Sequence, residues 1–452
     1  MYPGIPQRDR SLYSITEPRV EPRAFLVQCW KAAVRAVEGE NAVRVALDES
    51  GPESISHLLA VGKAASTMCK GALPILNHDG RCLVITKDGH VDDDLRHREN
   101  VVVIESSHPI PDQRSLDAGA QALEFVQSMP AESVLLMLVS GGASALMEML
   151  PSEIGLVELQ EMTDELISKG YHIGQINAVR KSISLIKGGK LLSHFGGRKV
   201  TVFAISDIPN DDLDLVGSGI GSEGKPSETD FEINFSLPDK VSGILGGLSP
   251  TPTPTPTPMP MSTGFSTNQT SHIYNNEDHT NYCGKIIASN SIARQAAAKF
   301  AKAQCINVVM ERSALNDDVF KVAQNLSDQI CIGAPGLYVF GGEPTINLPE
   351  VPGTGGRNQS LALAIAKLIR GAQGITVIAA GTAGTDGPTD AAGGIVDGDT
   401  FDALDGADEA LAGADAGTWL QQVGGLFVSG PTGTNVMDLV IALKQEDRKH
   451  GE

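Results

Sequence analysis

The sequence is poor in aromatic residues and lacks any cysteine arrangement typical of a metal site. Only 4% of the 452 residues are aromatic. The six cysteines are scattered, with no CxxC pair and no histidine at zinc-finger spacing. Cysteines scattered in this way are usually reduced and mostly buried thiols. The pattern therefore argues against a redox or metal-binding role for them.

Long apolar runs and an excess of positive charge are also missing. No run reaches the roughly 18 apolar residues that a membrane helix needs, and no basic segment followed by an apolar one opens the chain. The formal net charge of -20 argues against a surface for nucleic acid or anionic membranes. A few basic groups can still make one cleft positive enough to bind a small anion. We therefore expect a cytoplasmic enzyme that acts on small molecules.

Two common nucleotide-binding motifs are absent as well. No Gly-Lys pair is followed by Ser or Thr, so there is no Walker A loop. No convincing G-x-G-x-x-G follows an early strand with an acidic residue about 20 positions further on. A nucleotide must therefore be held in some other way.

What the chain does contain is a repeated order of apolar strand, turn and helix. Its length suits two domains of ordinary size. Strands that alternate with helices predict an α/β fold with a doubly wound, mostly parallel sheet. In the first half, strands are expected at residues 57–61, 82–86, 101–105, 134–139 and 200–205.

The pattern decays after Gly217 and resumes near residue 285. A Thr-Pro tract at 251–258 favours extended conformations and cannot supply a core. The strands expected beyond it repeat the architecture of the first half, and we place the active-site cleft between the two domains. The predicted parts are an N-terminal α/β domain at 23–245, a Thr/Pro-rich linker or insertion at 246–280 and a C-terminal α/β domain at 281–446.

The clearest single signal is the turn that follows residues 134–139. Six apolar residues end at Ser140-Gly141-Gly142-Ala143-Ser144, which predicts a buried strand leading into a helix. Glycine lets the backbone approach a ligand closely, and the amides at a helix start attract anions such as phosphate. A tight turn without a ligand explains the pattern equally well. The candidate phosphate-binding residues are Ser140, Gly141, Gly142 and Ser144.

Basic residues stand at two further places that suit an anion. Lys63 lies at a predicted strand-to-helix turn, where its charge would add to that of the helix start. Arg180 and Lys181 lie in a concentration of basic residues that is unusual for an acidic chain. The competing interpretations are a solvated lysine and a solvated helix face.

Carboxylates and an arginine complete a set suited to phosphoryl transfer. Asp207 follows the strand at 200–205, and the carboxyl end of a parallel strand is where α/β folds place their chemistry. It is therefore a candidate base or metal ligand. Arg357 opens a helix after two glycines. Gathered in one cleft, such residues can position a phosphoryl group and neutralise its charge. The candidate metal-site residues are Glu343, Asp386 and Asp390.

Eight motifs, in order along the chain, resemble those of the glycerate 2-kinase family. The resemblance covers about residues 23–218 and 284–444. The motifs are Val61-Gly62-Lys63-Ala64-Ala65, His108-Pro109-Ile110-Pro111-Asp112, Ser140-Gly141-Gly142-Ala143-Ser144-Ala145-Leu146, Asn177-Ala178-Val179-Arg180-Lys181, Lys187-Gly188-Gly189, Gly341-Gly342-Glu343-Pro344-Thr345, Gly355-Gly356-Arg357-Asn358-Gln359 and Gly430-Pro431-Thr432-Gly433-Thr434-Asn435. Their shared order argues against chance similarity.

The resemblance implies a glycerate kinase domain followed by a MOFRL-like α/β domain. It implies ATP-dependent phosphorylation of D-glycerate to 2-phosphoglycerate, with Mg²⁺ or another divalent cation. By the resemblance, Lys63 is the active-site lysine and Arg357 the critical arginine across the cleft, and Asn435 joins the substrate- or phosphate-binding candidates. The expected partners are D-glycerate and ATP, with no nucleic acid or membrane. The oligomeric state is left open, with a homodimer as one option.

The sequence departs from the family pattern at two places. Ser218-Gly219 continues as Ile220-Gly221, where the family often carries an SGPT-like segment. Ala383 stands where a GTDG-like pattern has its first aspartate. If that aspartate serves the chemistry, activity is reduced, so a non-catalytic protein that binds glycerate or a phosphorylated acid is one alternative. Hydroxypyruvate reduction is another, and the missing dinucleotide fingerprint counts against it.

Overall fold

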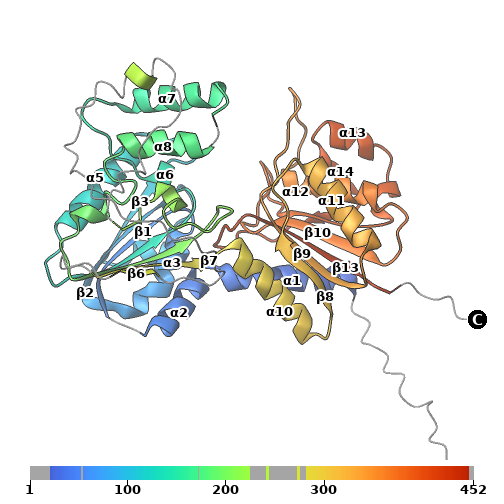
Figure 1. The fold of residues 1–452 in the computed structure, drawn as a ribbon, viewed down its shortest axis with the longest axis horizontal. Coiled ribbons are helices and arrows are strands. Elements are labelled where there is room, and N and C mark those ends of the chain that lie inside the picture. The colour runs from blue at the N-terminus through green and yellow to red at the C-terminus, as the bar shows by residue number, and fades with distance from the viewer. Residues whose placement is uncertain are drawn as a thin grey trace, which may run out of the picture.

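Two β-sheets lie side by side along the long axis of the molecule (Figure 1). The computed structural model describes residues 21–51, 54–171, 173–223, 241–243, 272–274 and 281–446. The Thr-Pro tract and the rest of the predicted linker at 246–280, apart from residues 272–274, lie outside the described residues. No helix within these ranges is long and apolar enough to cross a membrane.

The first sheet has seven strands, of which only the edge strand β6 is antiparallel. The strand order is β3-β2-β1-β4-β5-β7-β6. The strands are β1 (Ile55–Val61), β2 (Leu76–Lys87), β3 (Val101–Ser106), β4 (Val134–Val139), β5 (Lys199–Ile205), β6 (His272–Tyr274) and β7 (Asn281–Ala288). The prediction of an α/β fold with a doubly wound, mostly parallel sheet is confirmed.

Helices cover both faces of this sheet because the strands bury side chains on both sides. In β4, Leu136 and Leu138 belong to one apolar cluster, whereas Leu135 and Met137 belong to the other. The first cluster includes α2 (Gly39–Ser50), α3 (Ala65–Ala72) and α4 (Asp93–Arg96), and the second includes α5 (Gln113–Gln127) and α6 (Ala143–Leu146). Beyond the second face, α7 (Leu156–Ser168) and α8 (Ile173–Ile183) pack together in a small separate cluster. Single 3-10 turns lie at Leu73–Ile75, Leu192–His194 and Val216–Ser218.

The second sheet does not repeat the first, contrary to the prediction. Its order is β12-β11-β10-β13-β9-β8, and only β8 and β9 are parallel. The reason is β13, a strand that the sequence analysis did not include, which runs back between β9 and β10 and pairs antiparallel with both. The strands are β8 (Val308–Ser313), β9 (Gly336–Gly342), β10 (Ile375–Gly381), β11 (Gly393–Asp397), β12 (Leu426–Phe427) and β13 (Asp438–Lys444).

Helices cover both faces of the second sheet as well. One face packs against α11 (Val319–Ile332), α12 (Arg357–Leu368), α13 (Ala407–Ala412) and α14 (Ala416–Gln422). The other face packs against α1 (Pro22–Val37) and α10 (Asn290–Ala303). A 3-10 turn at Thr400–Asp402 follows β11.

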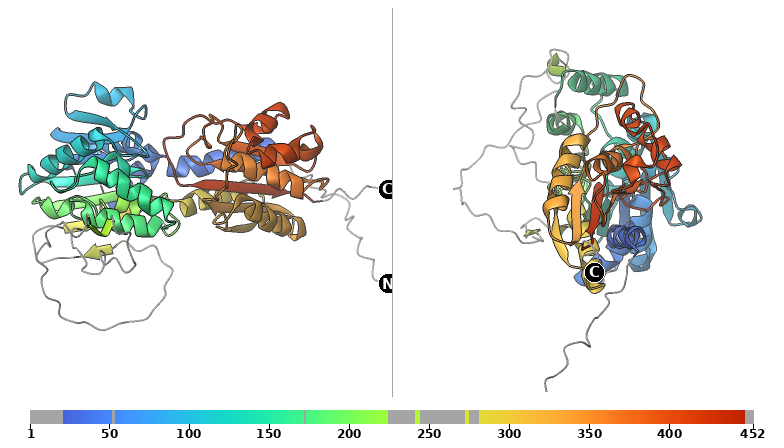
Figure 2. Two further views of the ribbon diagram at one scale, coloured as in Figure 1. Left: turned by 90° about the horizontal axis from the view of Figure 1, so that it is seen from above. Right: turned by 90° about the vertical axis from the view of Figure 1, so that its right-hand side faces the viewer.

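The predicted domain boundaries need correction at both ends of the first domain. β7, predicted to open the C-terminal domain at 281, pairs with β5 in the first sheet. The helix α1, predicted to open the N-terminal domain at 23, instead lies alongside the second sheet (Figures 1 and 2). Its Trp30 ring meets the Phe427 ring of β12 edge to face, with 5.0 Å between ring centroids. Sequence order therefore does not separate the two halves, because long-range apolar packing decides where α1 and β7 belong.

Candidate active site

The order of the strands reverses between β1 and β4. From β1 the chain moves outward to β2 and β3, whereas from β4 it moves the other way to β5 and β7. Open α/β sheets bind ligands beyond the carboxyl ends of their strands at such a switch point. β1 and β4 end together, with Val61 paired to Val139. The two turns singled out in the sequence, after residues 61 and 139, therefore meet at this point.

The two turns are held together by hydrogen bonds. The backbone N–H of Lys63 donates to the carbonyl oxygen of Gly141 at 2.9 Å. The N–H of Ala64 donates to Ser140 Oγ at 3.1 Å. Gly62 has φ +125, and a Cβ added there would lie 2.2 Å from Ser140 Oγ. Only glycine fits this crossing, and the side chain of Lys63 is fixed beside the Ser140-Gly141-Gly142 turn.

Asp207 joins the same turn from β5, the strand next to β4. A Cβ added to Gly141 would lie 2.0 Å from Asp207 Oδ2, so the glycine leaves room for the carboxylate. Burial raises the pKa of Asp207, while the positive charge of Lys63 opposes that rise. The structure thus brings together Lys63, Ser140, Gly141 and Asp207, as the sequence predicted.

The second sheet contributes to the electrostatics of this site. Burial lowers the pKa of Lys63, and the carboxylate of Asp207 is the largest opposing influence. Glu343 also raises this pKa and Arg357 lowers it. Both residues belong to the second half of the chain, so charges from the second sheet act on Lys63 in the first. Lys63 and Arg357 are therefore near enough for their charges to interact.

Arg357 is clamped by two carboxylates. Its Nε donates to Asp438 Oδ2 at 2.7 Å, and its NH1 pairs with Glu343 Oε1 at 2.8 Å. Burial lowers the pKa of the guanidinium, but charge attraction and hydrogen bonds from Asp438 and Glu343 outweigh that effect and raise it. Asp438 was missed by the sequence analysis because it is the first residue of the unpredicted strand β13. An aspartate at the start of an apolar run, as at residues 438–443, is the signal that points to it.

The loop that carries Asn435 reaches the first sheet. The carbonyl oxygen of Gly433 accepts hydrogen bonds from the N–H of Gly39 at 3.3 Å and from Thr67 Oγ1 at 2.9 Å. Thr67 lies in α3, the helix that follows Lys63. Asn435 Oδ1 accepts from the N–H of Met437 at 3.3 Å, which orders the end of this loop. The loop therefore links the Lys63 turn to the part of the chain that holds Asp438.

The predicted metal-site residues do not form a ligand group. Both oxygens of Asp386 accept hydrogen bonds from backbone N–H groups at the start of α12, those of Asn358 at 3.1 Å and Gln359 at 2.9 Å. Glu343 pairs with Arg357, and Asp390 is exposed. Throughout the described part of the chain, no three His, Cys, Asp or Glu side chains gather as a metal site. Asp386 is a helix cap, because buried carboxylates need partners and these amides supply them.

The basic segment around Arg180 is not a solvated face. Lys181 is only 8% exposed, and its Nζ donates to the carbonyl oxygen of Asp214 at 2.7 Å. Burial lowers the pKa of Arg180, with Glu148 acting in the opposite direction. The segment connects to the central turn indirectly. Gly188 N–H donates to the carbonyl oxygen of Ser218 at 3.0 Å, and Ser218 Oγ donates to Ser144 Oγ at 2.9 Å.

Comparison with known proteins agrees with this arrangement. A model described as a domain of unknown function, DUF4147, matches residues 25–231, and a model of the MOFRL family matches residues 336–438. The D-glycerate 2-kinase of Thermotoga maritima is 31% identical over 430 residues, which cover 93% of this chain and 98% of that protein. The chain belongs to the glycerate 2-kinase family.

Further relatives in the glycerate 2-kinase family support the assignment. The glycerate 2-kinase of Pyrococcus horikoshii is 34% identical, over 87% of this chain and 88% of that protein. The crystal structure of the glycerate kinase from Thermotoga maritima has a TM-score of 0.78 and 29% identity, covering 94% of this chain and 99% of that chain. The DUF4147 match contains Lys63 and Asp207, and the MOFRL match contains Arg357 and Asp438. The two matched regions therefore supply the two sides of the candidate site.

Ala383, the departure from the glycerate 2-kinase pattern, lies in a supporting turn. The hydroxyl of its neighbour Thr382 donates to the carbonyl oxygen of Met437 at 2.7 Å and accepts from the N–H of Val436 at 2.8 Å. A Cβ added to Gly384, on the other side, would lie 2.0 Å from the carbonyl oxygen of Gly430. This turn therefore backs the loop that carries Asn435.

We expect the activity of this family member to fall as the pH drops below about 6. Burial raises the pKa of Asp438 to about 6 from an ordinary value of 3.8, so protonation near that pH removes the negative partner of Arg357. The Asp438 contribution to stability has the opposite sign, because a raised carboxyl pKa favours the folded state at low pH. Measuring kcat/KM and unfolding in parallel between about pH 5 and 8 separates the two effects.

The Asp438→Asn variant is the control for this pH profile. Asparagine keeps the shape of the side chain but cannot ionise, so the variant should be less active at neutral pH and lack the limb near pH 6. An unchanged limb in Asp438→Asn would assign it to another group, with Asp207 the first candidate because burial raises its pKa too.

Proposed function

We propose that this chain catalyses the ATP-dependent phosphorylation of D-glycerate to 2-phosphoglycerate, releasing ADP. The observation that carries the proposal is the opposition of Lys63 and Arg357 beside Asp207 at the switch point of the first sheet. Membership of the glycerate 2-kinase family supplies the substrate, because the relatives over most of this chain are named for that reaction.

The proposed roles of Lys63 and Arg357 are electrostatic. Phosphoryl transfer spreads negative charge over the oxygens of the transferred group, and fixed positive groups stabilise that charge. The backbone of Lys63 is held by the first sheet, and the Arg357 guanidinium is held by Asp438 and Glu343. The backbone amides of Gly141 and Gly142 add donors on the Lys63 side, whereas the amide of Ser140 donates to the carbonyl oxygen of Val61. ATP bound between Lys63 and Arg357 would have its γ-phosphoryl group positioned by these donors.

Asp207 is the proposed base. Burial raises its pKa, which makes the carboxylate a better proton acceptor while Lys63 keeps it ionised. In the reaction, the hydroxyl oxygen on C2 of D-glycerate forms a bond to the γ-phosphorus as the bond from that phosphorus to the bridging oxygen breaks. The hydroxyl proton passes to Asp207, and ADP leaves with the bonding electrons of the broken bond.

A divalent cation fits this site only with help from ATP. Mg²⁺ commonly uses one or two carboxylates together with phosphate oxygens and water. Asp386 is committed to the start of α12, so of the predicted ligands Glu343 would hold the ion, beside Arg357. A bound Mg²⁺ would neutralise phosphate charge. Removing it with a chelator should therefore weaken ATP use without unfolding the protein.

A product assay tests the proposal. The purified protein is incubated with ATP, Mg²⁺ and D-glycerate, and ³¹P NMR resolves the phosphoglycerate isomers. We expect 2-phosphoglycerate, which would also show that Ala383 is tolerated. Formation of the 3-isomer alone would retain the kinase but refute the regiochemistry. Bound glycerate without any product would favour a non-catalytic binding protein.

A further inference from the structure

Four basic side chains converge beside the central turn from three neighbouring strands. Lys63 follows β1, Lys87 ends β2, His90 lies in the next turn, and His108 lies in the loop after β3. These strands are parallel, so their carboxyl ends lie along one edge. His90 Nδ1 is 3.3 Å from the carbonyl oxygen of Lys63. A Cβ added to Gly142 would lie 3.0 Å from His108 Cδ2 and 3.3 Å from Lys63 Cε.

The basic residues of this cluster form no direct ion pairs with the described acids. Burial lowers the pKa of His108 to about 4, and Lys63, Lys87 and His90 all act in the same direction. Burial also lowers the pKa of His90, again reinforced by both lysines. No described carboxylate forms an ion pair with any of the four bases. The two imidazoles are thus neutral hydrogen-bonding groups at neutral pH. The lysines supply positive charge without a direct ion pair among the described residues, although the nearby carboxylates of Asp207 and Glu343 act on Lys63.

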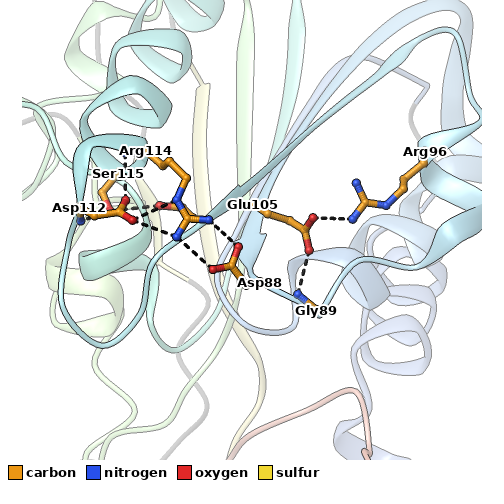
Figure 3. Close-up of polar contacts among 8 residues, drawn as sticks. Asp88, Gly89, Arg96, Glu105, Asp112, Arg114 and Ser115 are labelled. Carbon is orange, nitrogen blue, oxygen red and sulfur yellow. Dashed lines mark hydrogen bonds and ion pairs between the residues drawn. The ribbon is translucent and has the colours of Figure 1, made fainter.

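The acids near the cluster are turned to other partners, as Figure 3 shows. Arg114 binds Asp88 with NH1 at 2.6 Å and NH2 at 3.0 Å, and binds Asp112 with Nε at 3.0 Å. Glu105 accepts from the N–H of Gly89 at 2.8 Å and pairs with Arg96. This network ties the turn after β2 to the loop that carries His108. It fixes the basic residues near one another while keeping the neighbouring carboxylates occupied.

The central turn places this cluster next to the proposed base. Asp207 lies against Gly141 and His108 against Gly142, so the two side chains flank adjacent residues of one turn. A small hydroxy acid bound over this turn would present its hydroxyl to Asp207 and its carboxylate to the cluster.

We propose that Lys87, His90 and His108 form the subsite that holds the carboxylate of the acceptor substrate, next to Lys63. The proposal rests on the proposed kinase function. Lys87 supplies charge, and the His108 imidazole donates a hydrogen bond to a carboxylate oxygen, while the single N–H of neutral His90 donates to the carbonyl oxygen of Lys63 and orients that ring. This leaves Lys63, Arg357 and the Ser140-Gly141-Gly142 turn for the phosphoryl group. It also predicts that the site prefers an acid to a neutral polyol of the same length.

Steady-state kinetics of Lys87→Met and His108→Gln test the subsite. We expect the KM for D-glycerate to rise at least about tenfold in each variant, with kcat and the KM for ATP changed by less than about threefold. Lys302→Met is the matched control, because Lys302 is an exposed lysine at the end of α10 and loses the same charge. A rise in the KM for ATP instead would assign the cluster to a nucleotide phosphate. Unchanged constants in both variants would remove the subsite.

Binding measurements separate failure of the subsite from failure of the proposed function. Calorimetric titration of wild-type protein with D-glycerate and with its neutral amide needs no turnover. We expect a preference for the acid that shrinks at least about tenfold in Lys87→Met. If wild-type protein makes no phosphoglycerate yet shows this pattern, the kinase fails and the subsite stands. An active enzyme whose preference survives in both variants would refute the subsite alone.

Discussion

Replacing Lys63 with alanine is expected to lower kcat by at least about 100-fold while the protein stays folded. Removing one preorganised donor to developing charge typically costs two to three orders of magnitude, and a charged group in phosphoryl transfer about as much or more. Lys63 has no direct ion-pair partner among the described residues. Its removal lets the pKa of buried Asp207 rise further, so that carboxyl can take up a proton instead of remaining as an unpaired buried charge. The loss should therefore appear in kcat and not in the unfolding transition.

Arg357→Ala should lower turnover to a similar extent, but it also leaves Asp438 without its partner. Asp438 is fully buried, and a buried acid that loses its partner destabilises the fold. The double variant Arg357→Gln with Asp438→Asn removes both charges and keeps the volume. We expect it to regain most of the stability while remaining inactive. Lys302→Ala serves as the control for lysine removal, and near-normal turnover in both Lys63→Ala and Arg357→Ala would exclude these residues from the chemistry.

Breaking the ion pair between Glu148 and Lys187 is expected to have the largest effect on stability. Glu148 is 0% and Lys187 1% exposed, and the Lys187 ammonium donates to Glu148 Oε2. Ser184 Oγ donates to the other carboxylate oxygen at 2.5 Å. Lys187→Met would leave the carboxylate buried without its cation. Removing one partner of such a pair typically costs about 3–5 kcal/mol in the free energy of unfolding.

Urea denaturation of three variants resolves the contribution of this pair. We expect Lys187→Met and Glu148→Gln to shift the midpoint strongly at an unchanged slope, and the double variant to recover most of the loss. Recovery would show that the cost lies in the stranded charge and not in packing. Single variants as stable as the wild type would mean that water reaches the pair in solution.

The first half of the candidate site could be predicted from the sequence because each part lies at the end of its own strand. The apolar run at 134–139 is β4, and the residues after it and after β1 meet through strand pairing alone. Parallel sheets gather such turns at one edge, so Lys63, the glycine turn and Asp207 needed no side-chain detail.

The rest depended on contacts that a linear pattern does not contain. Asp386 was predicted as a metal ligand, but the fold places its carboxylate where it accepts hydrogen bonds from the first amides of α12. Lys187 belonged to a segment whose basic residues suited a solvated face, yet Glu148, far away in sequence, holds it in the interior. Asp438 was overlooked because β13 returns antiparallel between two strands, which strand-helix alternation does not predict.

The exchange of α1 and β7 between the halves bears on how such a protein can be divided. A fragment ending at residue 280 would lack β7 and expose the hydrogen-bonding edge of β5, which invites association between copies. A fragment beginning at residue 281 would lack α1 and uncover apolar side chains of β10 and β13. Neither half is complete without a segment that lies beside the other half in the sequence, so we expect both sheets to need the whole chain for stable folding.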